Sequence, residues 1–452
     1  MDQKALRACF ALSLLSLPSV TLASSFQLLE QSPAHMGKAF AGTASDITDA
    51  STVYFNPAGM ARLDGQHLTL GGNVVLTEAD FVNDGSNYVI QGNTVPVQGS
   101  GTTDETGFIP NAYWVVPVSE QFTLGLGAGG PFGLSSDFGT EWPGRYDATF
   151  SELEVTNLNL TSAWAPNDQI AFGVGINYQM IDVTLQSQFD STLGASPDPA
   201  TDSRASIEGD DDDIVFDASV LWTPAPGTQL GLIWRQGGDF TLDGSAAFEL
   251  NAACAPGAGS PTGAPPAPTT GTLCAGALTG LEGPVTAGAE LPDTITLSGS
   301  QQLNDVWTLH ADIAQTRWSS IQTIAVDNVD NGENVATLDL RYDDTLRLAL
   351  GASAALTDTF TLRFGVAQDE APQTDPEFVS PRIPDEDRTW LAVGANFHVF
   401  DSVTMDVSYA HLLVDDAQLE RTEPTPLGGS YTLEGSFDSS VNILAAQINW
   451  QF

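Results

Sequence analysis

The last nine residues of the chain, Leu444–Phe452, read LAAQINWQF. Every second residue counted back from Phe452 is apolar, and the intervening Gln451, Asn449 and Gln447 are polar. Successive side chains of a β-strand point to opposite faces, so this stretch is predicted to be a strand with one apolar face. Such a face points to the core in a soluble sandwich and to lipid in a membrane barrel.

The same alternation recurs from Gly65 onward, and the faces opposite the apolar ones carry small and charged residues. Further examples begin at Leu230, Trp307, Phe360 and Val403. Short turns alternate with long polar loops, which are predicted near residues 83–105, 139–149, 191–212, 251–290, 327–343, 370–387 and 420–437. About fourteen antiparallel strands with short turns at one end and long loops at the other predict an all-β outer-membrane barrel.

The first 23 residues have the three parts of a secretory signal peptide. Lys4 and Arg7 form a basic region, residues 8–17 form a short apolar run, and residues 21–23 read TLA, a small-x-small cleavage site. We therefore expect residues 1–23 to be removed on export. The apolar run is too short to serve as a membrane span.

Composition narrows the class of protein further. The chain has 14 Lys and Arg against 57 Asp and Glu, a formal net charge of -43, and this acidity argues against nucleic-acid binding. Hydrophobic residues make up 42% of the chain, which argues against general disorder. No internal apolar run approaches the roughly 18 residues of a membrane helix.

Enzyme motifs are not supported by their surroundings. Gly125–Gly130 fits GxGxxG but lies in an alternating strand with no helix behind it. No GxSxG nucleophile elbow is present, and the five histidines show no metal-ligand spacing. The four acids Asp210–Asp213 are interpreted as a solvated loop, with a Ca²⁺ site as the alternative. We therefore expect no enzyme activity, no cofactor and no bound metal.

Two cysteines remain after removal of the signal peptide. Cys254 and Cys274 both lie in a stretch rich in Pro, Gly, Ala and Thr. In an oxidising compartment two cysteines in one loop are expected to pair, and we predict this disulfide.

The segment after the signal peptide differs from the rest. Residues 24–60 have neither a period of 2 nor a sustained period of 3.6, and they end on the strong turn signal Asn56-Pro57-Ala58-Gly59. We interpret residues 24–62 as a compact plug, a name kept below, and residues 63–452 as the barrel around it.

Several motifs resemble the FadL family, the outer-membrane transporters of long-chain fatty acids and other hydrophobic compounds. The plug sequence is similar to the family's hatch, and Asn56, Pro57 and Ala58 match its Asn-Pro-Ala motif. Further matches cover nearly the whole mature chain in order: Gly129–Leu134, Trp142–Tyr146, Leu291–Thr294, Thr316–Ser319 and Pro381–Arg388.

The resemblance implies a fourteen-stranded barrel closed by the hatch and located in the bacterial outer membrane. Substrate is captured by extracellular loops, displaces the hatch and leaves sideways where the third strand kinks. Glycine tolerates unusual backbone angles and proline cannot donate to a ladder, so the kink is predicted at Gly129, Gly130, Pro131 and Gly133. We expect a monomer that contacts outer-membrane lipid and lipopolysaccharide.

Ligand and lumenal residues follow from polarity and strand parity. Phe26 and Leu28 of the plug and Phe132 and Phe138 of the wall are candidates for an apolar pocket, and Arg388 for a contact with a fatty-acid carboxylate. A lumenal network that satisfies buried charge and holds the plug is predicted from Arg235, Asp312, Arg347, Arg363 and Asp406.

One departure from the family keeps a second substrate class open. Well-studied fatty-acid transporters of the family carry basic residues in regions that here read Tyr178–Asp182 and Ser320–Ala325, with no Lys or Arg. Their absence favours transport of neutral hydrocarbons or aromatic compounds, whereas Arg388 favours fatty acids. A structural or adhesion barrel is the third interpretation.

Overall fold

The computed structural model of the protein describes residues 25–259, 262 and 267–452. It is an all-β protein built as a closed antiparallel barrel of fourteen strands. Strands β1 and β21 close the wall, with His67 opposite Gln451 and Asn83 opposite Gly435. The predicted signal peptide lies outside the described residues, and the limits of plug and barrel remain predictions.

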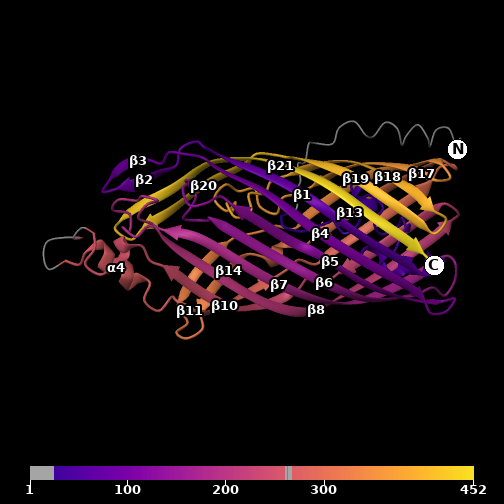
Figure 1. Ribbon diagram of the computed structural model, residues 1–452, viewed down its shortest axis with the longest axis horizontal. Coiled ribbons are helices and arrows are strands. Elements are labelled where there is room, and N and C mark those ends of the chain that lie inside the picture. The colour runs from indigo at the N-terminus through magenta and orange to yellow at the C-terminus, as the bar shows by residue number, and fades with distance from the viewer. Residues whose placement is uncertain (1–24, 260–261, 263–266) are drawn as a thin grey trace, which may run out of the picture.

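The wall begins with long strands, which cross it obliquely (Figure 1). The strands of the first half are β1 (His67–Asn83), β2 (Asn87–Ile90), β3 (Asn93–Pro96), β4 (Gly101–Pro117), β5 (Phe122–Asp137), β6 (Phe150–Trp164), β7 (Ile170–Phe189), β8 (Ser203–Ala225), β9 (Thr228–Arg235) and β10 (Asp239–Glu249). The remaining strands are β11 (Gly283–Glu290), β12 (Thr294–Gln302), β13 (Trp307–Thr316), β14 (Thr323–Asn328), β15 (Asn334–Asp339), β16 (Thr345–Thr357), β17 (Phe360–Asp369), β18 (Arg388–Phe400), β19 (Val403–Val414), β20 (Ala417–Thr425) and β21 (Gly429–Gln451).

Five barrel strands are interrupted and appear as two pieces each. The pieces are β9 with β10, β11 with β12, β13 with β14, β15 with β16, and β19 with β20, while β2 and β3 form an additional hairpin that pairs with β21. Figure 1 shows the hairpin and helix α4 at one end of the molecule and the C-terminus at the other.

Helices are few and short. They are α2 (Pro33–Met36), α3 (Thr52–Phe55) and α4 (Thr270–Ala277), with the 3₁₀ turns η1 (Pro57–Arg62), η2 (Ala252–Cys254) and η3 (Trp318–Ser320). None of the helices among the described residues is long and apolar enough to span a membrane.

Several of the predicted long loops are wrong because the strands extend into them. β4 begins at Gly101, β8 begins at Ser203, and the stretches predicted as loops near 251–290, 327–343 and 420–437 contain β11, β15 and most of β20. A strand crosses the hydrocarbon core in about 9–11 residues. The part beyond the membrane needs no apolar outer face, so it lacks the alternation from which strands were predicted.

An outward-facing apolar band surrounds the wall, with aromatic residues at the end of the short turns. Phe122 stacks on Trp164 at 6.5 Å, Trp164 on Phe172 at 5.9 Å, and Trp450 on Phe452 at 5.4 Å between ring centroids. Aromatic girdles of this kind mark the interface between membrane and water.

The plug fills the inside of the barrel. Ser32 caps α2 by accepting a hydrogen bond from the His35 N–H at 3.3 Å, and Pro33 occupies the first turn, where no donor is needed. Met36, Phe40 and other plug residues form one apolar core with the wall residues Tyr113, Val115, Trp390, Leu412 and Ile443. The main core of the protein is therefore the contact between plug and wall.

Candidate functional site

The third barrel strand, β5, changes register near its middle. Its pairing with β6 is regular up to Gly129 and resumes at Phe132, so three residue steps on β5 match two on β6. The extra residue is a β-bulge. Gly130 and Pro131 occupy it, and proline loses nothing there because no ladder bond is required of its nitrogen.

Above the bulge, β5 also separates from β4. Within the described residues the two strands pair only where 112–117 face 123–128. Nearer the loops, the Asp137 N–H donates a hydrogen bond to Thr103 Oγ1 at 3.0 Å. Between these two points residues 104–111 and 129–136 form no ladder with each other, and this break in the strand pairing is called the lateral opening below.

An aromatic cluster closes the upper end of this opening. Trp142, in the loop after β5, packs against Phe81 of β1 at 5.6 Å and against Phe138 at 4.5 Å between centroids. Phe138 also packs on Phe437 at 5.7 Å. Phe138, which was predicted to line the pocket, therefore belongs to this cluster and borders neither of the two cavities described below.

The start of the plug is hydrogen-bonded to the bulge. The Leu28 N–H donates to the Pro131 carbonyl at 2.8 Å, and the Gly133 N–H donates to the Phe26 carbonyl at 3.0 Å. Residues 26–28 thus add a short antiparallel segment to the inner side of β5. The rim of the opening is therefore hydrogen-bonded to the plug.

A large cavity of about 690 Å³ lies behind the opening. Its lining comes from plug residues 25–30, from β4, β5 and β6 around the opening, and from the inner faces of β17, β18, β19 and β21. Leu28 and Phe132, two of the predicted pocket residues, line it. Phe108, which is 67% exposed, lies at the outer rim.

A second, smaller cavity of about 110 Å³ lies toward the loops and is lined mainly by aliphatic side chains. Phe26 borders both cavities and is buried between Trp318, at 4.9 Å, and Phe132, at 5.9 Å. Trp318 belongs to the motif Thr316–Ser319 but was not predicted as a pocket residue, and it is completely buried. The Phe26 ring is therefore the partition between the two cavities.

Arg388, the predicted carboxylate contact, lines the large cavity and already has protein partners. Its Nη2 donates to Asp385 Oδ1 at 3.0 Å and to the Ser25 carbonyl at 2.9 Å. These contacts hold the start of the plug against β18. A role for Arg388 in ligand binding remains a prediction.

The predicted lumenal charges all contact the plug or each other. Arg347 donates to the Ala39 carbonyl at 2.7 Å, and Arg235 donates to the Tyr54 carbonyl with its guanidinium 3.9 Å from the Tyr54 ring centre. Asp312 accepts from the Gly42 N–H at 2.6 Å. Basic and acidic groups of the wall therefore satisfy backbone groups in the turns and short helices of the plug.

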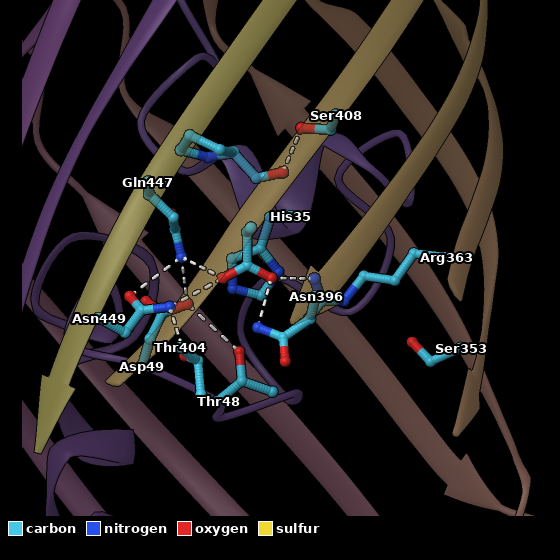
Figure 2. A network of polar contacts seen from close by, with 12 residues as sticks. His35, Thr48, Asp49, Ser353, Arg363, Asn396, Thr404, Ser408, Gln447 and Asn449 are labelled. Atoms are coloured by element: carbon cyan, nitrogen blue, oxygen red, sulfur yellow. Dashed lines mark hydrogen bonds and ion pairs between the residues drawn. The ribbon is translucent and has the colours of Figure 1, made fainter. Parts of the chain in front are cut away.

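Asp406 of β19 is the centre of a polar network that joins β17, β18, β19 and β21 to the plug. Figure 2 shows its partners Arg363, Asn396, Gln447 and Asn449. Asp406 pairs with Arg363 and accepts from Asn396 at 2.9 Å and from Gln447 at 3.0 Å. Gln447 also donates to Asp49 of the plug at 3.0 Å. A buried charge needs this number of partners, because an unpaired one is costly.

The Asn-Pro-Ala motif joins two parts of the plug to the wall. The Asn56 side chain accepts from the Ala58 N–H at 3.1 Å and donates to the Ala44 carbonyl. The Ala58 N–H also donates to Ser219 Oγ of β8 at 3.0 Å. Pro57 begins η1, where a missing donor costs nothing.

Inward-facing glycines of the wall form the seat of the plug, a feature that sequence reasoning missed. A Cβ at Gly365 would overlap the backbone of Lys38, and one at Gly231 would overlap that of Ala44. Gly173 lies in the same way under Pro57 and Ala58. The sequence does contain a signal for this seat. The alternation of each strand places a glycine, among larger residues, at a position that faces the inside of the barrel.

Two further predictions concern the loops. The structure contains a disulfide between Cys254 and Cys274, which joins η2 to α4. Asp210–Asp213 belong to strand β8 and not to a loop, and Asp211 accepts from the Thr241 N–H at 2.6 Å. In the part of the chain that the structure describes, no group of three or more His, Cys, Asp or Glu is placed to hold a metal ion.

The stability of the loop at residues 370–387 should depend on pH. Burial raises the pKa of Asp385 to about 6, and burial with the neighbouring Asp387 raises that of Glu386 to about 7. Both values lie above those of the unfolded chain, about 4, so the stabilisation is complete below pH 4 and is lost as the pH rises through 6 to 7. We expect faster amide hydrogen exchange in this loop at pH 8 than at pH 5, after correction for the intrinsic rate.

The control for this measurement is Glu386→Gln, which removes the group with the higher pKa. The variant should show a smaller difference between the two pH values. Equal protection of the wild-type loop at pH 5 and pH 8 would contradict the prediction.

Known outer-membrane proteins resemble this chain over most of its length. Residues 14–452 match the family model described as outer membrane protein transport protein (OMPP1/FadL/TodX). The chain is 28% identical over 427 residues to outer membrane protein P1 of Haemophilus influenzae, with 86% of each chain covered. It is 27% identical over 445 residues to the long-chain fatty acid transport protein of Escherichia coli K12, covering 91% of this chain and 93% of that one.

Solved structures share the fold. A FadL homologue of Pseudomonas aeruginosa superposes with a TM-score of 0.82 at 24% identity, over 95% of this chain and all of that one. The toluene transporter TodX of P. putida superposes with a TM-score of 0.65 at 15% identity, over 96% of this chain and 99% of that one.

Proposed function

The chain belongs to the OMPP1/FadL/TodX family of outer membrane transport proteins, and we propose that its substrates are long-chain fatty acids. Membership makes it an outer-membrane transporter of hydrophobic compounds, and proteins of this family are channels, not enzymes. We propose further that residues 1–23 are a signal peptide, that residues 24–62 are the plug, and that the barrel works as a monomer in contact with outer-membrane lipid and lipopolysaccharide.

The proposed route starts among the extracellular loops and ends in the membrane. The substrate enters the small apolar cavity, passes Phe26 into the large cavity, and leaves through the opening between β4 and β5. The observation that carries this proposal is the pair of hydrogen bonds between residues 26–28 and the bulge of β5. Displacement of Phe26 by a ligand would break them and free the rim of the opening in the same movement.

The physical chemistry of the substrate favours a lateral route. Burial of one CH₂ group is worth about 0.8 kcal/mol. A water-filled pore would leave a long acyl chain exposed to water, so it is an unfavourable path. The large cavity connects the apolar ring of Phe26 to the outward-facing Phe108 at the rim. An acyl chain on this path exchanges one apolar environment for another.

Relatives support fatty acids as the substrate. The E. coli protein with which this chain aligns over nine-tenths of its length is named a long-chain fatty acid transport protein. The toluene transporters share only the fold with this chain at about 15% identity.

Neutral hydrocarbons or aromatic compounds are the second candidate. The observation in their favour is that the small cavity is lined mainly by aliphatic side chains, while Arg388 is already paired with Asp385. A structural or adhesion barrel is the third candidate. It has less support, because two cavities border the plug and one of them reaches the outer face of the wall.

Uptake assays distinguish the three candidates. The full chain is produced in a bacterial host that lacks its own fatty-acid transporter, and the uptake of labelled oleate, hexadecane and toluene is compared with that of cells carrying an empty vector. We expect a large increase for oleate, on the order of 10-fold. Uptake of hexadecane or toluene alone would establish the second candidate, and no increase for any compound would favour the structural barrel.

A further inference from the structure

Arg382 lies at the loop end of the small cavity. Its Nη1 donates to the carbonyl oxygens of Phe150 and Gln186, each at 3.2 Å, and to Ser151 Oγ at 3.0 Å. These three partners are neutral, and they fix the guanidinium over the ends of β6 and β7. The side chain remains partly accessible, and it borders the cavity together with Leu185 and Ile207.

The charged groups nearest to Arg382 form ion pairs with each other and not with Arg382. Asp147 and Arg421, whose charges act on Arg382, pair with each other at 3.5 Å, and Arg421 also approaches Glu423 at 3.8 Å. In the described part of the chain no carboxylate lies within ion-pair distance of Arg382. The neighbouring Arg388, by contrast, has Asp385 as its partner.

A cation that is partly removed from water and has no counter-ion is costly. Burial lowers the pKa of Arg382 to about 10, a value at which the group is still protonated in neutral solution. Within the described residues Nη1 makes all the side-chain hydrogen bonds of this guanidinium, so Nε and Nη2 keep the capacity to donate to a planar anion.

We propose that Arg382 binds the carboxylate of an incoming fatty acid and thereby determines the specificity of the small cavity for anionic over neutral chains. The carboxylate is held at the loop end, and the acyl chain extends along Leu185 and Ile207 toward Phe26. The substrate therefore meets the partition with its tail first. This inference rests on the proposed function and assigns the head-group site within the same route.

The test measures binding to the purified full-length protein in detergent, with oleate, methyl oleate and oleylamine as ligands of one chain length. The wild-type protein should bind oleate about 10- to 100-fold more tightly than methyl oleate, since a charged hydrogen-bonded pair is lost in the ester. Oleylamine should bind more weakly than methyl oleate, because its ammonium group would meet an unpaired guanidinium.

Variants then locate the preference. Arg382→Gln should bind oleate and methyl oleate equally, with unchanged affinity for the ester, which also shows that the cavity is intact. Arg382→Lys should keep part of the preference. Arg341→Gln, which removes an exposed arginine of the same region, is the matched control and should retain all of it.

The outcomes separate this inference from the proposed function. If the wild-type protein binds none of the three ligands, both fail. If it prefers oleate and Arg382→Gln keeps that preference, or if oleylamine binds as tightly as oleate, fatty-acid transport stands and the assignment of Arg382 is overturned. The oleylamine comparison needs no variant, so oleylamine binding as tight as that of oleate would overturn the assignment even if Arg382→Gln does not fold.

Discussion

Deletion of Pro131 is expected to reduce oleate uptake to the level of cells without the transporter. The bulge on β5 contains one residue more than the facing stretch of β6, and removal of that residue restores a regular register. A regular β5 can continue its ladder with β4 past Ala128, because the backbone groups of residues 104–111 are then within reach. The lateral opening would close, and a substrate in the large cavity would have no exit.

The measurement is the uptake of labelled oleate in the host described above, with binding of oleate to the purified variant measured in parallel. Binding should persist, since Arg382 and the small cavity are unchanged, while uptake is lost. Pro131→Ala is the matched control. It keeps the extra residue, so the bulge and most of the uptake should remain. Full uptake after the deletion would show that the substrate leaves by another path.

Replacement of Gly365 by valine is expected to open a path for water and ions past the plug. The glycine faces inward from β17, and the backbone of Lys38 occupies the space that a side chain would need. Overpacking of a well-filled core costs about 1–3 kcal/mol. The plug can avoid this cost by moving away from β17, which would loosen the Asp46 ion pair of Lys38 and the nearby Asp406 network.

Single-channel conductance in planar bilayers is the direct measurement, and sensitivity of the cells to a large hydrophilic antibiotic is the cellular one. We expect both to increase about 10-fold or more, since 1.4 kcal/mol changes an equilibrium tenfold. Gly288→Val is the matched control: it also lies in a strand, and a Cβ there meets no atom within 4 Å. A Gly365→Val barrel of normal stability whose conductance does not increase would contradict the prediction that these glycines form the seat of the plug.

Local patterns in the sequence were enough for the wall, and the resemblance to the FadL family indicated where the third strand is irregular. The alternation in Leu444–Phe452 predicts a strand with one apolar face, and the matching strand β21 closes the barrel against β1. The bulge lies where Gly130 and Pro131 remove a side chain and a donor. The alternation of apolar and polar residues depends on positions one or two apart, so it can be recognised without knowledge of the fold.

The extent of the strands was harder to predict. The extracellular parts of β8, β11 and β15 carry polar residues on their outer faces, because water and not lipid surrounds them. Their hydrogen bonds to neighbouring strands keep them extended, and that partnership is not visible in a single segment.

The composition and alternation of the chain by themselves predicted an acidic outer-membrane barrel, which the fold and the family model confirm, while export and the plug remain predictions. Only the tertiary structure decided which residues line the two cavities. Phe26 meets Trp318, and Gly365 meets Lys38, across hundreds of residues of chain. Arg382 and Arg388 lie in one motif, yet Arg388 has a carboxylate partner and Arg382 has neutral ones. The physical reason is that closure of the barrel, a long-range event, sets the surroundings of every inward-facing side chain.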